Sequence, residues 1–225
     1  MARLPRLVLA GQPHLVIQRA LDRHAAFADA EDRAHFADVL REGLAVEKVQ
    51  LHAYALLADE LRLLATPDEP AALGRLMQAI GRRYVVAYNR RHARRGTLWE
   101  GRFRAAPVEP GEWLLAAMAW IEQADDVPGV TSAAHHLGAR RDPLITDPPA
   151  FWQLGNTPFE REAQWRRRLA DTPSAQEAAR LRRAALGGWA CGSVAFVAAA
   201  SASGRPAAPR PRGRPRRESG PDQPA

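Results

Sequence analysis

Two charged side chains of opposite sign stand two residues apart in an apolar segment, at Glu60 and Arg62. The apolar residues on both sides predict two short strands, 49–57 and 60–65, joined by a tight turn at 58–59. Alternate residues of a strand project from the same face, so the carboxylate and the guanidinium should lie side by side. A carboxylate is a hard ligand that suits Mg²⁺, but a guanidinium beside it repels a divalent cation. We therefore expect an ion pair here rather than a metal site.

The histidines offer little further chemistry. His135 and His136 are neighbours in a segment without periodicity, where adjacent side chains face apart. A solvated loop is the expected setting for this pair, not a metal site. His14 and His52 fall within predicted strands and are expected to be sheet residues. Asp59 adjoins Glu60, but no second acid that would be buried lies nearby in the sequence, so acid–base catalysis is not indicated.

Positive charge is concentrated in two parts of the 225-residue chain, whose net charge is +7. Residues 82–104 contain eight arginines and one acid, and residues 205–225 contain six arginines and two acids. Two basic blocks on an otherwise mildly acidic body are typical of a nucleic-acid-binding protein. Lys48 is the only lysine. A GC-rich genome explains that preference for arginine, but not the clustering.

Composition also indicates the cellular compartment in which the protein is expected. The single cysteine, Cys191, excludes an internal disulfide and favours a reducing environment. No apolar run reaches the roughly 18–20 residues that span a bilayer. Arg3 and Arg6 near the N-terminus precede no long apolar core, so a signal peptide is not expected. These features predict a cytoplasmic protein with neither a membrane partner nor a small-molecule substrate.

The elements that position Glu60 and Arg62 follow from apolar periodicity and from helix-start and turn residues. The predicted elements are a strand (14–20), a helix capped by Asp29 (29–44), two strands (49–57 and 60–65), a helix opened by Asp68 and Pro70 and ended by Gly96, a turn followed by a fourth strand (97–108) and a helix (111–123). Glu31 and Asp32 suit the first turn of the first helix. The order strand, helix, strand, strand, helix, strand is that of a ferredoxin-like α+β domain with an antiparallel sheet.

The second predicted helix separates an apolar stripe from a set of arginines. The stripe consists of Leu73, Leu76 or Met77, Ile80, Tyr84 and Tyr88. Arg83, Arg90 and Arg94 fall on a different face, and Arg91 stands four residues before Arg95. We expect the two tyrosines to be core residues rather than nucleophiles.

The chain beyond residue 150 is predicted to contain a charged helical segment and a tail that cannot form a core. Residues 158–186 are charged and look helical, and Gly187 with Gly188 ends that segment. The last residues are rich in Arg, Pro and Gly, cannot bury a core and should be disordered. The expected parts are therefore a domain over 1–150, a helical extension over 151–200 and a disordered tail over 201–225.

Long sequence strings carry a resemblance that covers most of the chain. They are Gly11-Gln12-Pro13-His14, Gly81-Arg82-Arg83-Tyr84-Val85, Tyr88-Asn89-Arg90-Arg91, Gly96-Thr97-Leu98-Trp99-Glu100-Gly101-Arg102 and Gly187-Gly188-Trp189-Ala190. These strings resemble the REP-associated tyrosine transposases, a subgroup of the HUH-type single-tyrosine transposases. The resemblance implies a ferredoxin-like nuclease domain that binds a DNA hairpin at palindromic repeats.

The residues that would carry the family's chemistry are replaced. In that family a His-hydrophobic-His triplet holds Mg²⁺ or Mn²⁺, and a tyrosine attacks the polarised phosphate. Here Glu60-Leu61-Arg62 takes the place of the triplet, Trp120 that of the tyrosine, and Ala124 that of the polar residue that follows. An indole has no nucleophilic oxygen. The resemblance therefore implies a catalytically inactive member, without catalytic residues or a metal cofactor.

The expected DNA contacts lie in the two basic blocks. Trp99 would stack on an unpaired base. The alternative is that Trp99 lies in the core and that the arginines only form a solvated face. In the tail, Pro211-Arg212-Gly213-Arg214-Pro215 resembles an AT-hook that follows a narrow minor groove. The predicted DNA-binding residues are Arg82, Arg83, Arg90, Arg91, Arg94, Arg95, Trp99, Arg102, Arg210, Arg212 and Arg214.

Three hypotheses remain open at this point. The first is a nucleoid-associated bacterial protein of the DNA transposition class that recognises hairpin or palindromic repeat DNA and cannot cleave it. The second is a working metal-dependent nuclease that uses Glu60 and another nucleophile. The third is a decayed protein without a DNA role, or an interaction module that pairs with an active paralogue. Strand cleavage in Mg²⁺ or Mn²⁺ distinguishes the second, and binding that ignores DNA structure favours the third.

Overall fold

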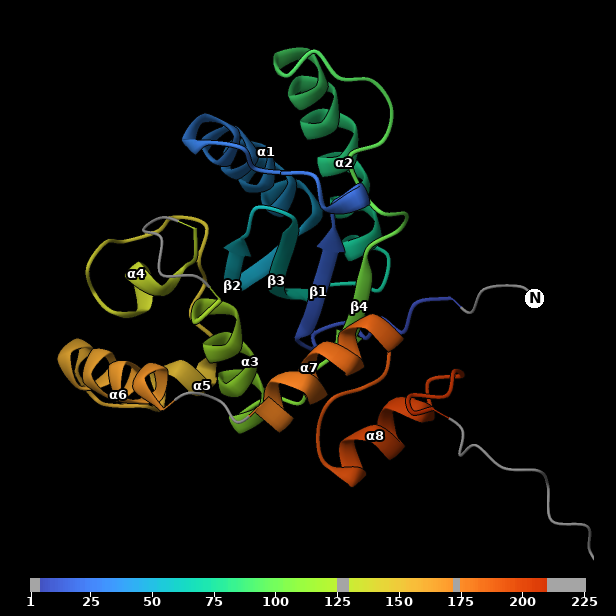
Figure 1. Cartoon of the computed structure of the whole chain (residues 1–225). Coiled ribbons are helices and arrows are strands. Elements are labelled where there is room, and N and C mark those ends of the chain that lie inside the picture. The colour runs from blue at the N-terminus through green and yellow to red at the C-terminus, as the bar shows by residue number, and fades with distance from the viewer. Residues whose placement is uncertain (1–4, 125–129, 172–174, 210–225) are drawn as a thin grey trace, which may run out of the picture.

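A four-stranded antiparallel sheet is the centre of the fold in the computed structural model, which describes residues 5–124, 130–171 and 175–209 (Figure 1). Its strands are β1 (His14–Arg19), β2 (Val49–Leu56), β3 (Glu60–Pro67) and β4 (Arg104–Pro107). They lie in the order β2-β3-β1-β4, with helix α1 (Ala30–Glu47) between β1 and β2 and helix α2 (Ala72–Arg91) between β3 and β4. This is the predicted ferredoxin-like α+β fold.

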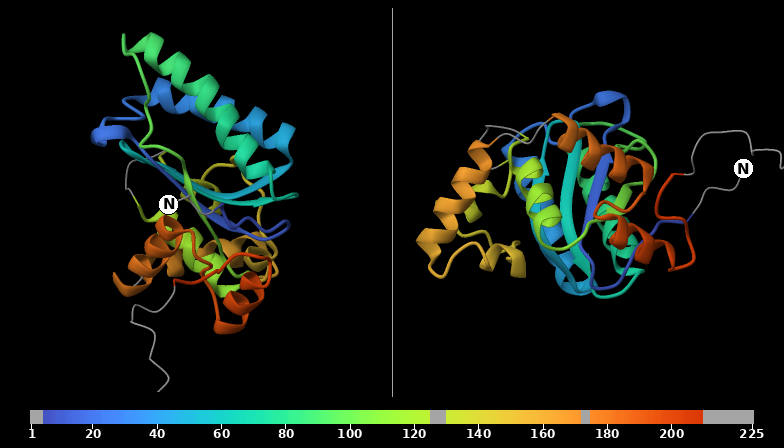
Figure 2. Two further views of the ribbon diagram at one scale, coloured as in Figure 1. Left: turned by 90° about the vertical axis from the view of Figure 1, so that its right-hand side faces the viewer. Right: turned by 90° about the horizontal axis from the view of Figure 1, so that it is seen from below.

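Two layers of helices enclose the sheet (Figure 2). Helices α1 and α2 cover one face, and α3 (Glu112–Glu122) and α7 (Ala175–Gly187) lie against the other. Neighbouring side chains of β1 alternate between the two layers, because Val16 joins the core under α1 and α2 whereas Leu15 and Ile17 join the core under α3. The remaining helices are η1 (Leu21–Arg23), α4 (Ala133–His136), α5 (Pro149–Trp152), α6 (Pro158–Ala170) and α8 (Val194–Ser201).

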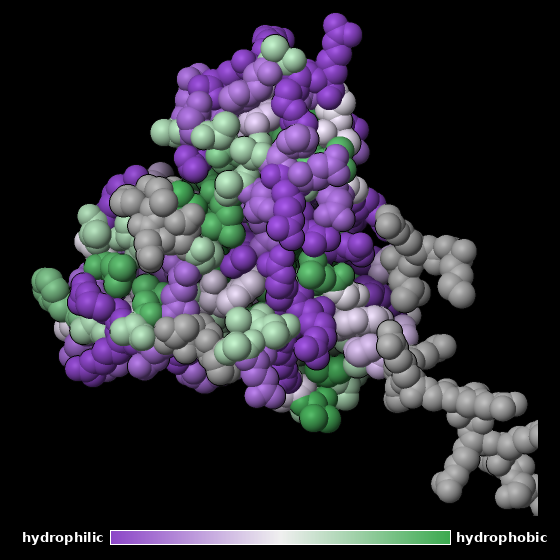
Figure 3. Space-filling view, in the orientation of Figure 1, coloured by the Kyte–Doolittle hydropathy of each residue, from purple (hydrophilic) through white to green (hydrophobic). Residues whose placement is uncertain are grey.

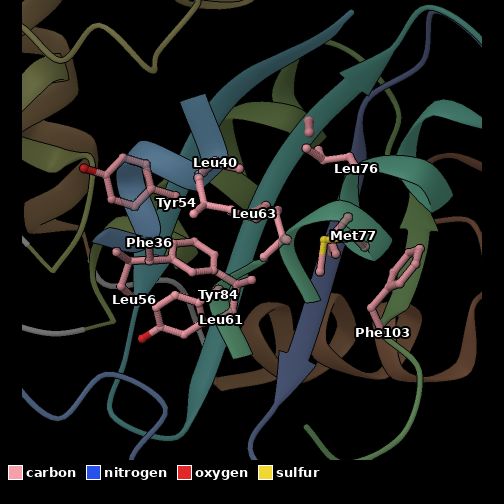
Figure 4. Close-up of a cluster of buried hydrophobic side chains, with 14 of the residues drawn as sticks. Phe36, Leu40, Tyr54, Leu56, Leu61, Leu63, Leu76, Met77, Tyr84 and Phe103 are labelled. Carbon is pink, nitrogen blue, oxygen red and sulfur yellow. The ribbon is translucent and has the colours of Figure 1, made fainter. Parts of the chain in front are cut away.

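The core beneath α1 and α2 contains the predicted apolar stripe (Figure 4). Tyr84 is completely buried and donates a hydrogen bond from its hydroxyl to the carbonyl of Ala26 over 2.6 Å. Tyr88 donates similarly to the carbonyl of Ala25. Burial raises the pKa of both phenols. The two tyrosines are structural, as predicted, and neither is available as a replacement nucleophile.

Local signals located the first helix and the β2–β3 turn correctly. Asp29 accepts a hydrogen bond from the amide of Asp32 over 3.0 Å and caps α1. The turn at 58–59 is closed by the amide of Leu57, which donates to the carbonyl of Glu60 over 2.9 Å. Thus Glu60 opens β3 directly after the turn.

The second helix differs from its prediction at both ends. The Asp68 side chain does not cap it; the amide of Asp68 donates instead to the carbonyl of Lys48, and Ala71 is the N-cap. Helix α2 ends at Arg91 rather than at Gly96, because Ala93 has a left-handed φ of 49° and the chain turns back there. The fourth strand is likewise short, since residues 97–103 form turns before β4 begins.

The C-terminal extension continues beyond its predicted end. Ala207 is buried, and its carbonyl accepts a hydrogen bond from the amide of Ala190 over 2.8 Å. Leu7 of the N-terminal arm packs against Ala200 and Ala207. Residues 201–209 are therefore folded onto the domain, contrary to the predicted disorder from 201. The predicted contacts of Arg210, Arg212 and Arg214 lie outside the described residues. None of the helices in the described ranges has the length and apolar character that a bilayer span requires.

Candidate functional site

The predicted ion pair on β3 is present, and it has a third member. The Nε of Arg62 donates to Oε1 of Glu60 over 2.7 Å. Arg182 of α7 donates from both terminal nitrogens to the two oxygens of Glu60, over 2.9 and 2.8 Å. Glu60 is only 4% exposed. One buried carboxylate thus holds two guanidiniums, and we call these three residues the Glu60 cluster.

The indole predicted to replace the nucleophile contacts the same cluster. The guanidinium carbon of Arg62 lies 4.1 Å from the centre of the Trp120 ring, a cation–π arrangement. Trp120 projects from α3 and is 9% exposed. The structure therefore brings Glu60, Arg62 and Trp120 together. Ala124 follows α3 in the same half of the core and offers no polar group.

Burial and pairing have opposite effects on the charges of the Glu60 cluster. Burial raises the pKa of Glu60, but hydrogen bonds from Arg182 and Arg62 outweigh it and hold the pKa below its usual range. Burial also lowers the pKa of Arg62, and the hydrogen bond to Glu60 offsets only part of that effect. The cluster accordingly carries one more positive than negative charge near neutral pH.

A divalent metal does not fit this donor set. Both oxygens of Glu60 accept hydrogen bonds from guanidiniums, so a cation would have to displace Arg62 and Arg182. The two sheet histidines are also engaged: His14 accepts from the amide of Leu9, and His52 contacts Thr66 and the carbonyl of Thr146. Neither imidazole is placed to complete a metal shell at the Glu60 cluster.

The prediction for His135 and His136 is wrong, since both rings approach the same carboxylate. His136 is 1% exposed on α4, with Nδ1 2.6 Å from Glu122 and Nε2 3.4 Å from Oδ1 of Asp147. The Nε2 of His135 lies 3.3 Å from that oxygen. Burial alone would lower the pKa of His136, but Glu122 and Asp147 raise it to about 9. The ring is therefore a buried imidazolium between two acids.

These histidines and Asp147 form the one group with metal-ligand spacing that the described residues contain. The backbone amide of Asp142 donates to Nδ1 of His135 over 3.0 Å, which leaves the proton of a neutral ring on Nε2. That nitrogen lies 3.3 Å from Oδ1 of Asp147, and neither this oxygen nor Nε2 of His136 has a hydrogen-bond partner among the described residues. The ligand atoms of the three residues lie within 4.8 Å of one another, so the group has the geometry of a cation site as well as that of a charged structural network.

The predicted DNA-binding arginines divide into two sets. Arg91 pairs with the three acids at the start of α1, at 2.6 to 2.9 Å, and so joins α2 to α1. Arg83 pairs with Glu42 over 2.5 Å, and Arg94 lies over the ring of Tyr88. Across the described ranges, no acidic partner is found for the exposed arginines Arg82, Arg90, Arg95 and Arg102.

Trp99 is a core residue and not a stacking platform. It is 9% exposed, and its ring centre lies 6.2 Å from that of Phe27 and 6.5 Å from that of Tyr84. A bridge between Ala20 and Trp99 fixes its backbone beside the end of β1. Of the two readings open for Trp99, the core position is correct.

A pocket of about 570 Å³ opens beside the Glu60 cluster, at the end of the sheet where β1 finishes and β3 begins. Arg19 of β1 faces Glu60 in the strand register and pairs with Glu100 over 3.0 Å. The loop that carries Arg95 and Arg102 returns to this end, because the amide of Glu100 donates to the carbonyl of Arg19. Hydrophilic side chains gather over the middle of this face, above β1 and α7 (Figure 3).

Arg182 is the site residue that sequence reasoning missed. It lies 122 positions from Glu60, in a helix that also contains Arg180 and Arg183. Arg180 instead stacks over the ring of Trp113, at 4.1 Å. Nothing in the sequence spacing distinguishes these arginines, since only the packing of α7 on the sheet selects one of them.

Comparisons with known proteins bear on the fold. No protein-family model matches the sequence, and no curated protein matches it. Among solved structures, the chain is similar to a REP-associated tyrosine transposase bound to a REP hairpin, with 12% identity, a TM-score of 0.51, and coverage of 67% of this chain and 93% of that one. It also matches a candidate transposase from Deinococcus radiodurans, with 23% identity, a TM-score of 0.38, and coverage of 48% and 88%. The first likeness shows a shared fold.

Proposed function

We propose that this protein belongs to the DNA transposition class and binds hairpin or palindromic repeat DNA without cleaving it. The observation that carries the proposal is the Glu60 cluster in contact with Trp120. The sequence resemblance assigns these residues to the positions of the family's metal ligands and nucleophile, and the fold shared with a hairpin-bound transposase supports DNA as the partner. Nucleoid association follows from DNA binding as a further expectation.

The chemistry of the cluster supports binding over cleavage. A guanidinium offers fixed donors that suit a phosphate oxygen, but it has no open coordination position and cannot polarise a scissile bond as a metal does. Arg62 uses Nε for Glu60, so its two terminal nitrogens are left for another acceptor. Trp120 supplies no nucleophilic oxygen. A phosphate in the adjoining pocket would be held by Arg62, Arg182 and Arg19.

The basic loop beside the pocket supports DNA as the ligand. Arg95 and Arg102 are exposed at the same end of the sheet as the Glu60 cluster. Each phosphate that an arginine neutralises releases counterions, so affinity should fall steeply with salt. The choice of a hairpin rests on the similar transposase structure, in which the bound DNA is a REP hairpin.

The test is a titration of the protein with a labelled single-stranded hairpin and a shuffled strand of equal composition, in Mg²⁺ or Mn²⁺. We expect hairpin-selective binding and an intact strand. In the double variant Arg95→Gln, Arg102→Gln, the slope of log affinity against log salt should fall by about 0.7–0.9 for each lost phosphate contact. The control Arg83→Gln removes an arginine already paired with Glu42 and should leave the slope unchanged.

Two outcomes would overturn the proposal. Cleavage by the native chain would mean that a nucleophile acts somewhere other than at Trp120. Equal binding to the hairpin and the shuffled strand would favour an interaction module instead of a DNA-recognition protein.

A further inference from the structure

Three side chains near the edge strand β2 lie at distances that suit a bound metal ion. They are His135 and His136 of α4 and Asp147, which precedes α5. The Nε2 atoms of the two histidines lie 3.3 and 3.4 Å from Oδ1 of Asp147, and all three atoms lie within 4.8 Å of one another. Ligands about 2.0–2.1 Å from a tetrahedral zinc ion are separated by about 3.3 Å. We call these three residues the histidine site.

The fold assembles the histidine site by fastening the segment around α4 to β2, beside which α4 lies (Figure 1). One backbone bridge joins Thr131 to Ala55, before the histidines in the chain. A second bridge joins Ile145 to Leu51, just before Asp147. Two attachments to one strand therefore position the ligands from both sides.

Two of the ligand atoms are polar atoms that the fold leaves without a partner. His136 is 1% exposed, and neither its Nε2 nor Oδ1 of Asp147 has a hydrogen-bond partner within the described ranges. Buried polar atoms nearly always have a partner, so an unsatisfied pair that faces one another needs an explanation. A cation between the two atoms would satisfy both.

The other nitrogen of His136 is held as metal-binding histidines usually are. Its Nδ1 lies 2.6 Å from Oε1 of Glu122, a carboxylate that also accepts hydrogen bonds from Ser132 and from the indole of Trp165. A carboxylate at Nδ1 keeps a proton on that nitrogen, so the lone pair of the neutral ring is on Nε2 and faces Asp147. Such a carboxylate–histidine pair orients the ring and strengthens it as a ligand.

Charge and ligand type select the kind of ion. In the metal-free protein the His136 ring carries one positive charge between two acids, Glu122 and Asp147. A divalent ion that releases the proton from Nε2 leaves the charges of both acids balanced. Two imidazoles and one carboxylate suit zinc and related transition metals, whereas Mg²⁺ and Ca²⁺ prefer oxygen ligands. Three protein ligands leave the fourth position of a tetrahedral ion for water.

His135 has to exchange one hydrogen bond in order to bind. Its Nδ1 accepts from the amide of Asp142 over 3.0 Å, so the proton of the neutral ring lies on Nε2 without a metal. Coordination through Nε2 moves that proton to Nδ1, where it opposes the amide. Metal binding by His135 is therefore coupled to loss of the hydrogen bond from Asp142, which gives the site a signal of its own.

We propose that His135, His136 and Asp147 bind one zinc ion, which fastens the segment around α4 to the edge of the sheet. The histidine site shares no residue with the Glu60 cluster. The ion has a structural role, so the proposal holds whether or not the protein binds DNA.

The first test is a metal titration of the full chain, prepared without a histidine tag and stripped with a chelator. Co²⁺ is the spectroscopic probe, because it absorbs strongly in the visible range when it is tetrahedral. We expect one equivalent of Co²⁺ to produce this absorption and one equivalent of Zn²⁺ to abolish it. At free Zn²⁺ about 100 times Kd, the thermal midpoint should rise by about 5–10 °C. Failure of Zn²⁺ to raise the midpoint would overturn the proposal.

A double variant tests the ligands themselves. The side chains of His135 and Asp147 are 15% and 18% exposed, so His135→Gln with Asp147→Asn leaves the buried ring of His136 in place. This variant should lose the rise in midpoint. The matched control, His24→Gln with Asp38→Asn, changes an exposed histidine and an exposed aspartate and should retain it. A full rise in the variant of the histidine site would place the ion elsewhere and overturn the proposal.

A measurement on the native chain does not depend on the folding of any variant. Backbone amide NMR signals are followed while Zn²⁺ is added. The amide of Asp142 should shift, because its hydrogen bond to His135 is lost. The amide of Asp32, which donates to Asp29, should not. A shift at Asp32 alone would place the ion at the acids that begin α1, and an unchanged Asp142 signal would exclude His135 as a ligand; either result would overturn the proposal.

Discussion

Replacement of Glu60 by glutamine should destabilise the protein more than replacement of either arginine that it holds. Without the carboxylate, Arg62 keeps a positive charge on a side chain that is 13% exposed. Removal of one partner from a buried ion pair costs about 3–5 kcal/mol. The Arg182 side chain is 38% exposed and can turn toward water, so we expect a value near the lower limit, about 3 kcal/mol.

Arg62→Gln should cost less, about 1–2 kcal/mol, because Glu60 keeps both hydrogen bonds from Arg182. Urea unfolding at pH 7, followed by far-UV circular dichroism, measures these differences. For a chain of this size a loss of about 3 kcal/mol lowers the thermal midpoint by about 6–12 °C. The double variant Glu60→Gln, Arg62→Gln should lose less unfolding free energy than the sum of the losses in the two single variants. Equal costs for the single variants would refute the role given to Arg182.

The effect of Glu60→Gln should also depend on pH. The pKa of Glu60 is below its ordinary value of 4.5, so its charged form stabilises the folded state above that pH. This contribution is lost as the pH falls through the lowered pKa. The stability difference between the native protein and Glu60→Gln should thus be complete at pH 7 and shrink below about pH 4. A difference that is the same at pH 7 and pH 3 would contradict the assignment.

Three other perturbations test the remaining structural roles. The pKa of His136 is raised to about 9, so its charged form stabilises the folded state fully below pH 6.5, the unfolded value. This stabilisation is lost as the pH rises through 9. The unfolding free energies of His136→Asn and the native protein, measured in urea, should therefore differ most at pH 6 and least at pH 10. Trp99→Ala should cost about 3–5 kcal/mol by thermal unfolding without changing the salt slope of DNA binding, whereas a lower slope would favour the stacking role. Arg91→Gln should lower the thermal midpoint, unlike Arg90→Gln, because only Arg91 ties α2 to the acids at the start of α1; equal midpoints would contradict this.

The fold was predictable because its signals are local. Nearly continuous apolar runs on both sides of a turn placed β2 and β3, and a capping aspartate placed the start of α1 within one residue. The stripe that ends in Tyr84 and Tyr88 is buried as its spacing indicated. The end of α2 was missed because His92, Ala93, Arg94 and Arg95 can all continue a helix. The chain instead leaves the helix at His92, whose ring contacts Asp32 of α1 at 3.0 Å.

The site was predictable only in part, for a different reason. The pair Glu60 and Arg62 follows from strand periodicity alone, since both partners lie on one strand. The core contact of Trp99 and the ion pair of Arg91 could not be predicted, because the partner of each lies more than 50 positions away. The sequence does not show whether a basic or aromatic side chain contacts an acidic residue, the protein core or a nucleic acid. Only the fold supplies the partner.

The residues of the Glu60 cluster and Trp120 are better understood as one mutually dependent group than as separate residues. Arg62 is held by Glu60 on one side and by Trp120 on the other, and Glu60 is held in turn by Arg182. Restoring the resembled family's residues with Glu60→His, Arg62→His and Trp120→Tyr would leave Arg182 without its carboxylate, and a fixed cation beside two imidazoles opposes a divalent metal. Any restored metal site therefore requires a fourth change, at Arg182. Such dependence is expected because each charge in a low-dielectric site constrains its neighbours.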